Sequence, residues 1–202
     1  MPVRYPPTTL LALFLGLVAA SSASAQSGYS TGFKWGRTEL DSIVSVRTPV
    51  RGESEQDPEL PWAVAFRTSS YYNRFFMMRL DYAASPQFAA QLRDGTQTMV
   101  IDVDKFFRRV VKTEFLHFVK PRLTGQHPVS LPAAPDGSAL HRTYAGRDDL
   151  SQSPATLEAT WFVRANVLYV FMCTTTDVET LRAGEEKRQF FGTITIREPN
   201  GE

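Results

Sequence analysis

The stretch of residues 159–196 constrains the fold more than any other part of the chain. A polar break at residues 164–166 separates a β-branched and aromatic segment from the continuously apolar segment 167–173. Asn166 suits the break because asparagine tolerates the left-handed backbone of hairpin turns. An apolar segment of this length, bounded by turn residues, is typical of a strand covered on both faces. We therefore predict a hairpin whose second strand is buried.

A helix and a short last strand are expected after this hairpin. Thr176 and Glu179 have the spacing of a capping box, in which each side chain satisfies a backbone N–H of the first turn. The helix is predicted to reach Gln189 or Phe190, with Gly192 as its stop signal. Residues 193–196 alternate Thr and Ile, as a half-buried strand does.

The first 25 residues predict a cleaved export signal. Arg4 gives a positive start, residues 10–20 form an apolar segment of eleven residues, and Ala23-Ser24-Ala25 matches a small-x-small cleavage site. Eleven apolar residues are too few to span a bilayer, which requires about 20. We expect a mature chain that starts at Gln26, has no transmembrane segment, and resides in the periplasm or the extracellular medium.

Charge and cysteine content narrow the function classes. The formal net charge is +1, and removing Arg4 with the signal leaves zero, which argues against a nucleic-acid partner. Cys173 is the sole cysteine, so no intramolecular disulfide can form. Its position inside an apolar segment predicts a small buried residue rather than a nucleophile.

The remainder of the mature chain reads as one domain over residues 26–202, with a core of about residues 33–196. Strands are expected at residues 41–46, 62–68, 71–82, 127–131 and 140–144, and short polar connectors at residues 120–125 and 146–154. The acidic segment 51–61 is expected to be a solvated loop. Pro86 can start a short helix that ends near Leu92.

The clearest amphipathic helix is predicted over residues 102–113. Five apolar side chains share the face that would meet the core: Val103, Phe106, Phe107, Val110 and Val111. Four cations share the opposite face: Lys105, Arg108, Arg109 and Lys112. The helix can continue toward Phe118.

The order of antiparallel strands, central helix, further strands, C-terminal helix and last strand predicts an α+β layered domain. The segments SIVSVRTP (42–49), YVF (169–171) and EEKRQFFGTITI (185–196) resemble the PsbP family. The resemblance covers about residues 33–196 and implies a mostly antiparallel sheet flanked by helices in an α/β/α sandwich. It also implies a non-enzymatic binding or assembly role. No photosystem-linked function and no metal or chloride ligand carries over with it.

The basic helix face is the most specific functional hint, and Lys120 and Arg122 lie just beyond it. We hypothesise that it contacts an anionic partner, either an acidic protein surface or lipid headgroups. The alternative is an ordinary solvated helix face. A second candidate surface comprises Tyr71, Tyr72 and Arg74, which can be either core or contact residues.

Catalytic and metal motifs are missing from the sequence. His117, His127 and His141 lack ligand spacing, and there is no GxSxG, Walker A, GxGxxG or CxxC motif. We therefore expect no cofactor, and an exported non-catalytic binding or assembly module of the cell envelope. Two alternatives stay open. One is an envelope hydrolase whose site is not recognisable from sequence, and the other is a structural protein whose acidic segment and basic helix mate between copies. The oligomeric state is open as well.

Overall fold

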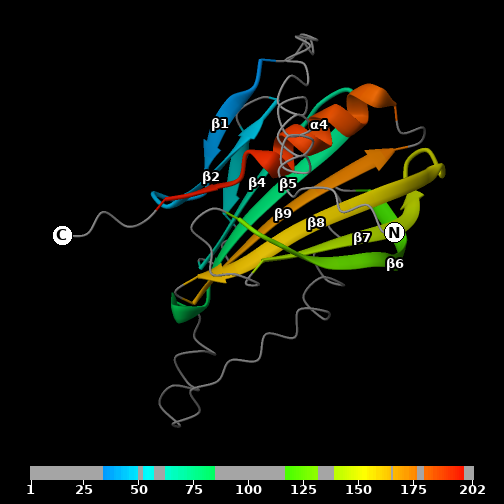
Figure 1. The fold of residues 1–202 in the computed structure, drawn as a ribbon. Coiled ribbons are helices and arrows are strands. Elements are labelled where there is room, and N and C mark those ends of the chain that lie inside the picture. Colours follow the sequence, from blue (N-terminus) through cyan, green and yellow to red (C-terminus); the bar gives the residue numbers. More distant parts are fainter. Residues whose placement is uncertain are drawn as a thin grey trace, which may run out of the picture. The chain divides into compact units, whose positions relative to one another are not determined.

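A computed structural model describes residues 34–49, 52–56, 62–84, 117–131, 139–164, 166–176 and 180–197. All of them belong to one compact unit, Phe33–Glu202. They form two antiparallel sheets and the helix α4, Leu181–Gly192, as Figure 1 shows. The predicted α+β class with a mostly antiparallel sheet is confirmed.

The large sheet contains seven strands, and every neighbouring pair is antiparallel. The middle strand, β9 (Val167–Thr176), is buried along nearly its whole length, as the apolar segment predicts. In sheet order the strands are β3 (Glu53–Gln56), β4 (Ala63–Ser69), β5 (Asn73–Asp81), β9 (Val167–Thr176), β8 (Pro154–Arg164), β7 (Ala139–Asp148) and β6 (Phe118–Val129).

Both hairpins with clear sequence signals are confirmed. β8 pairs with β9 across a turn in which Asn166 has a φ of 65°, the left-handed conformation expected of it. β4 and β5 form the second antiparallel hairpin, across the turn at residues 70–72, and the 3-10 turn Tyr82–Ala84 follows β5. Local turn chemistry and apolar runs therefore define the centre of the sheet.

The small sheet has the order β1-β2-β10, with β1 at Gly36–Glu39, β2 at Val44–Thr48 and β10 at Thr195–Ile196. β2 and β10 follow the predicted strands closely. β1 was not expected, because its sequence GRTE has no apolar residue to produce an alternating pattern.

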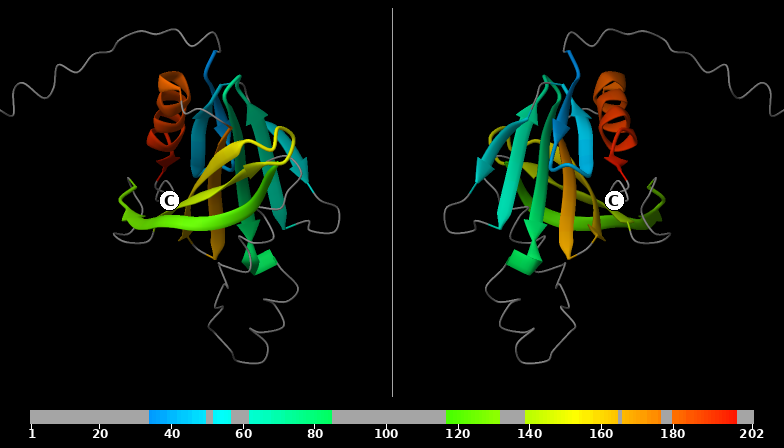
Figure 2. Two further views of the ribbon diagram at one scale, coloured as in Figure 1. Left: turned by 90° about the vertical axis from the view of Figure 1, so that its right-hand side faces the viewer. Right: turned by 90° about the vertical axis from the view of Figure 1, so that its left-hand side faces the viewer.

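The small sheet and α4 lie on the same face of the large sheet (Figure 2), and an apolar cluster fills the space between them. Phe190 of α4 is fully buried, with its ring centroid 4.8 Å from that of Phe75 and 6.3 Å from that of Phe171. A second buried cluster lies on the other face of the large sheet and includes Phe76, Trp161 and Met172. The sheet is therefore covered on both faces at its centre.

The large sheet is strongly curled. Arg74 of β5 forms an ion pair with Asp148 of β7, although β9 and β8 lie between these two strands. Neighbouring strands lie about 4.8 Å apart, so a flat sheet would separate the two backbones by about 14 Å. One arginine side chain bridges them because the sheet bends around the face that both residues share.

The predicted helix start is wrong. Thr176 does not cap α4, because it pairs with Ala155 as the last residue of β9. The N-cap is Thr180, whose side-chain oxygen accepts a hydrogen bond from the Ala183 N–H at 3.1 Å. Pairing with β8 keeps Thr176 in β9, so the N-cap of the helix lies four residues later than predicted.

Three predicted loops are also corrected. Residues 120–125 belong to β6, residues 146–148 belong to β7, and residues 53–56 of the acidic segment form β3. β3 and β6 are the edges of the sheet, where polar residues remain in water and no apolar alternation is required. β6 is irregular as well, with two register shifts and a φ of 53° at Lys120. The helix predicted over 102–113 does not reach Phe118, which is the first residue of β6.

Several predictions fall outside the described residues: the export signal, the helix starting at Pro86 and the basic helix over 102–113. In the part of the chain that is described, no helix has the length and apolar character needed to cross a bilayer.

Candidate functional site

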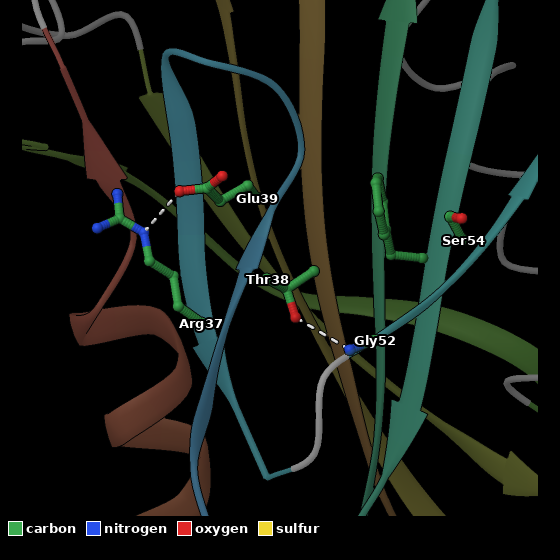
Figure 3. Close-up of a pocket in the computed structure, with 6 residues that line it drawn as sticks. Arg37, Thr38, Glu39, Gly52 and Ser54 are labelled. Carbon is green, nitrogen blue, oxygen red and sulfur yellow. Dashed lines mark hydrogen bonds and ion pairs between the residues drawn. The ribbon is translucent and has the colours of Figure 1, made fainter.

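A hollow of about 440 Å³ opens between β1 of the small sheet and β3 of the large sheet (Figure 3). It is lined by Arg37, Thr38, Glu39, Gly52, Ser54 and Phe66. The hollow arises because the two sheets separate here, with one edge strand from each on either side. Its size falls in the range of ligand-binding pockets, about 300–1,000 Å³.

Thr38 connects β1 to Gly52, the residue that precedes β3. Its side-chain oxygen accepts a hydrogen bond from the Gly52 N–H at 3.0 Å and lies 2.9 Å from the Thr48 hydroxyl oxygen, with which it shares a hydrogen bond. A Cβ atom at Gly52 would lie 3.3 Å from a methyl carbon of Thr38 and 3.4 Å from Phe66 Cβ. The start of β3 can approach β1 this closely because residue 52 is a glycine.

The hydrogen bonds of β2 show which backbone groups of β1 face toward β2 and which face away from it. The Arg47 N–H donates to the Thr193 hydroxyl oxygen at 3.1 Å, and the Ile43 carbonyl accepts from the Arg197 N–H at 2.9 Å. Both bonds point toward β10, on the far side of β2 from β1. Backbone groups alternate in direction along a strand, so the odd-numbered residues of β2 face β10 and the even-numbered ones face β1.

This direction determines which groups of β1 are already paired. Thr38 lies opposite Val46, whose backbone groups face β1, so these two residues form a hydrogen-bonded pair. Arg37 and Glu39 lie on either side of Thr38 and therefore direct their N–H and C=O groups away from β2. Among the described residues no strand pairs with this edge of β1, because β1 ends the small sheet. The hollow is thus bordered by open backbone donors and acceptors.

The side chains of Arg37 and Glu39 form the outer rim of the site and project to the opposite side of β1 from Thr38 (Figure 3). Arg37 Nε lies 3.4 Å from Glu39 Oε1, and an Arg37 nitrogen donates to the Ser45 hydroxyl oxygen at 2.8 Å. Arg197 lies 3.7 Å from the same Glu39 oxygen. All three charged side chains are about half exposed, so these ion pairs are weak and exchangeable.

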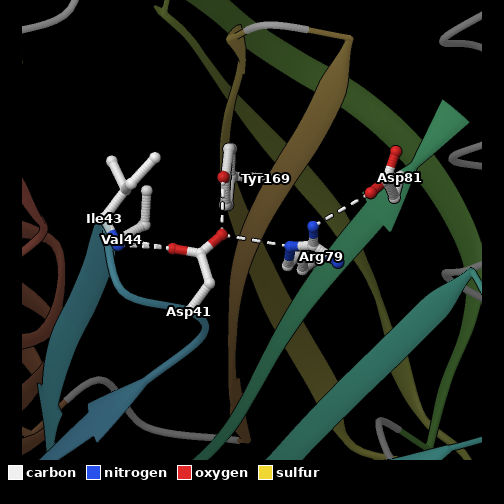
Figure 4. A network of polar contacts seen from close by, with 6 residues as sticks. All are labelled: Asp41, Ile43, Val44, Arg79, Asp81 and Tyr169. Atoms are coloured by element: carbon white, nitrogen blue, oxygen red, sulfur yellow. Dashed lines mark hydrogen bonds and ion pairs between the residues drawn. The ribbon is translucent and has the colours of Figure 1, made fainter. Parts of the chain in front are cut away.

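A polar network holds the turn that connects β1 to β2 (Figure 4). Asp41 accepts hydrogen bonds from the backbone N–H groups of Ile43 and Val44, from the Tyr169 hydroxyl at 2.7 Å and from Arg79 at 3.0 Å. Burial raises the pKa of the Asp41 carboxyl, but the hydrogen bonds that it accepts outweigh burial, so its pKa is lowered. Burial and then the Asp41 charge raise the pKa of Tyr169. The network fixes the β1–β2 hairpin, and hence the open edge, against β5 and β9.

A second polar cluster connects α4 to the large sheet. Lys187 Nζ donates to Glu158 Oε1 at 2.6 Å, and His141 Nε2 lies 3.5 Å from the other Glu158 oxygen. Burial raises the pKa of Glu158, but the hydrogen bonds and charges of His141 and Lys187 outweigh it, and the pKa falls to about 2. Cys173 is fully buried, as predicted, and burial raises the pKa of its thiol.

The histidines are spread unevenly. The rings of His127 and His141 lie 5.0 Å apart on neighbouring strands, and His117 precedes β6. In the described ranges no group of three or more His, Cys, Asp or Glu side chains is placed to hold a metal ion.

The second predicted surface is only partly assembled. Tyr71 is 83% exposed, and its ring meets that of Tyr72 edge-on at 5.0 Å in the β4–β5 turn. The turn is fixed to α4, because Ser70 and Asn73 both donate to the buried carboxylate of Glu186. Arg74, the second residue of β5, forms an ion pair with Asp148 of β7. None of the three predicted residues lines the hollow.

The four cations of the predicted basic helix, Lys105, Arg108, Arg109 and Lys112, lie outside the described residues. Lys120 and Arg122, which follow that helix in sequence, are exposed on β6. Arg122 lies opposite Ala145, two residues before the exposed Arg147, so both arginines project from the same face of the sheet.

Sequence reasoning missed the hollow. Its residues come from three strands, and the contact between β1 and β3 depends on tertiary packing. The sequence contains one signal for this strand. Arg37 and Glu39 alternate with Thr38, and in a strand this spacing places the two charges on one face and the hydroxyl on the other.

Several solved structures match this chain, and two of them are compared with it below. No protein-family model and no curated protein matches the chain. The Ran-binding protein Mog1p of Saccharomyces cerevisiae is 9% identical, with 81% of this chain and 96% of that chain covered and a TM-score of 0.42. PA94 of Pseudomonas aeruginosa, a protein of unknown function, is 12% identical, with 82% and 99% covered and a TM-score of 0.42. Likeness of this size says nothing about what this chain binds.

Proposed function

We propose that the protein is an exported, non-catalytic binding module that holds its ligand in the hollow between β1 and β3. One observation carries the proposal: a hollow of about 440 Å³ is bordered by open backbone groups of Arg37 and Glu39 and lined by the side chain of Phe66. Backbone donors and acceptors beside an aromatic ring are the contacts that orient and hold a bound molecule.

The chemistry of the lining favours binding over bond-making. Among the described residues that line the hollow, the titratable ones are Arg37 and Glu39, which pair with each other on the rim. Thr38 and Ser54 contribute hydroxyl groups, and the Thr38 oxygen already accepts from Gly52. These groups supply hydrogen bonds and apolar contact to a ligand that stays chemically unchanged.

The test is selection of ligands from a phage-displayed library of random eight-residue peptides. Selection on the wild-type protein is compared with selection on Ser54→Trp, which fills the hollow from an exposed position on β3. Ser151→Trp, at an exposed position in the β7–β8 turn, is the matched control. We expect enriched peptides that bind wild type and the control equally and bind Ser54→Trp at least about 10-fold more weakly, the loss of a few packed contacts. Peptides that bind all three proteins equally, or no enrichment on the wild type, would refute the proposal.

A second candidate function is contact with an anionic partner, and it is favoured by the exposed cations Lys120, Arg122 and Arg147 along the β6 edge. Such a cluster attracts acidic protein surfaces or lipid headgroups at low salt. Charge reversal of Lys120 and Arg122 should abolish co-sedimentation with phosphatidylglycerol vesicles or retention on polyglutamate resin, according to which partner is bound. Retention that survives both reversals would exclude this edge. The hypothesis for Lys105, Arg108, Arg109 and Lys112 is tested by the same reversal at those positions.

Export and the PsbP-like α/β/α sandwich are further parts of the proposal. α4 supplies helical cover on one face of the large sheet, which supports the sandwich. The helices predicted within residues 85–113 are the natural source of a second layer. N-terminal sequencing of the protein from its native cell envelope should give Gln26 as the first residue, and an uncleaved Met1 there would contradict export by a cleaved signal.

A further inference from the structure

We propose that the ligand of the hollow is an extended segment of a partner polypeptide, which adds as an antiparallel strand to the open edge of β1. This inference rests on the proposed function, because it names the class of ligand for the same site. It assigns the partner segment a basic–apolar–acidic sequence pattern.

The backbone of β1 supplies the first argument. Arg37 and Glu39 each direct one N–H and one C=O toward the hollow, and no described strand pairs with them. An open edge of this kind is a template for an added strand, which would lie about 4.8 Å from β1. A partner segment would form hydrogen-bonded pairs with both residues, in the manner of other domains that bind peptides by strand addition.

The side chains of these two residues supply the second argument. Arg37 and Glu39 project from the same face of β1 and carry opposite charges. Opposite charges directly across an antiparallel pair stabilise the pairing, and like charges destabilise it. The segment therefore places a basic residue opposite Glu39 and, two positions later, an acidic residue opposite Arg37.

The middle residue of the segment lies opposite Thr38, whose side chain points inward and is buried. Side chains alternate along a strand, so the middle side chain of the segment also points inward, into the hollow lined by Phe66. We assign an apolar side chain to this position, because burying apolar surface against Phe66 is favourable.

A second copy of this chain would offer Arg37-Thr38-Glu39 itself, which has the required charges in the required order. Its middle residue is a threonine, whose hydroxyl would enter the hollow beside Phe66. A partner segment with an apolar middle residue meets the aromatic lining better, and we assign the edge to such a partner.

The test uses the acetylated peptide Ser-Thr-Lys-Val-Glu-Thr-Ser and the full mature chain, followed by NMR. In the proposed register the N–H groups of the peptide Lys and Glu face β1, and the N–H of Val faces away. N-methylation of both Lys and Glu should weaken binding at least about 10-fold, the loss of two hydrogen bonds, whereas N-methylation of Val should leave binding nearly unchanged. The double charge swap Arg37→Glu with Glu39→Arg should reverse the preference between the Lys-Val-Glu peptide and its Glu-Val-Lys counterpart.

The outcomes separate this inference from the function on which it rests. If the peptide binds but is equally sensitive to N-methylation at all positions, strand addition is overturned and the hollow remains a binding site. If the peptide does not bind, the assigned sequence pattern is overturned, while selection with Ser54→Trp still decides whether the hollow binds at all. A dimer of the free protein that Arg37→Glu disperses would assign the edge to a second copy and overturn the assignment to a partner segment.

Discussion

Glu158 provides the sharpest test of how α4 is held on the sheet. The carboxylate receives a hydrogen bond from Lys187, whose side chain is only 8% exposed, and lies beside His141. Glu158→Gln keeps the shape of the side chain and removes its charge. The substitution therefore removes the charged acceptor of the hydrogen bond that the buried Lys187 ammonium group donates.

The magnitude follows from the pKa of Glu158. A fall from 4.5 to about 2 corresponds to about 3 kcal/mol at full value. Because the carboxylate keeps some contact with water, we take about 1–2 kcal/mol for this contribution. Breaking a fully buried ion pair costs about 3–5 kcal/mol, which sets the upper limit here because the Glu158 side chain is 22% exposed. We expect Glu158→Gln to lower the free energy of unfolding by about 2–4 kcal/mol at pH 7.

The sign of the pH dependence is fixed by the direction of the shift. A carboxyl whose pKa is lowered on folding stabilises the protein above its unfolded pKa, and this stabilisation is lost as the pH falls from about 4.5 toward 2. Urea unfolding of wild type and Glu158→Gln at pH 7, 4 and 3 should therefore give a difference that shrinks as the pH falls. Glu185→Gln, on the same helix, is the control and should change stability by less than about 0.5 kcal/mol. A difference that is small at pH 7, or equal at all three pH values, would refute the reasoning.

Three further predictions concern the same packing. Phe190→Ala should lower the free energy of unfolding in urea by about 3–5 kcal/mol, because it empties a fully buried site between α4 and the sheet; a loss below about 1 kcal/mol would contradict this packing. Thr180→Ala should cost about 1 kcal/mol in the same assay through loss of the cap on Ala183, and a neutral result would move the cap elsewhere. Cys173 should not react with Ellman's reagent at pH 8 until the protein is unfolded in urea, because burial excludes the reagent and raises the pKa of the thiol; rapid reaction of the native protein would show that β9 opens.

The parts of the fold that sequence predicts are those with local signals. The hairpin around Asn166 and the buried strand β9 follow from a turn residue and an apolar run within about a dozen residues. The predicted helix start was wrong because threonine suits a strand as well as a helix cap. The pairing of Thr176 with Ala155 places it in β9. A local pattern yields when a long-range pairing competes with it.

Most residues of the edge strands escape prediction for a related reason, although the strand expected at residues 127–131 covers the end of β6. β3 and β6 are polar because one side of each strand faces no neighbour in the described sheet, so their sequences lack the apolar alternation that marks an inner strand. β1 is short and wholly polar on its outward face, and it is a strand because β2 lies beside it.

The candidate site could not be predicted because it lies between β1 and β3, two strands that the sequence does not predict. The hollow exists where β1 and β3 separate, and its lining brings together Thr38 and Gly52, which are 14 residues apart in the sequence. The surface of Tyr71, Tyr72 and Arg74 illustrates the opposite case. Adjacent residues suggested one surface, but Tyr71 and Tyr72 lie in the β4–β5 turn, whereas Arg74 belongs to β5 and reaches across the curled sheet to Asp148.

Photo-crosslinking in the native cell tests the central claim, that the hollow binds a polypeptide, most directly. Benzoylphenylalanine is placed at Glu53, the exposed neighbour of Ser54 on β3, and, as control, at the exposed Arg188 on α4. We predict a defined protein adduct from position 53 that is absent from position 188 and does not form when the Ser-Thr-Lys-Val-Glu-Thr-Ser peptide is present in the isolated envelope during irradiation. The same adducts from both positions, or none from position 53, would contradict the claim that this hollow holds a partner.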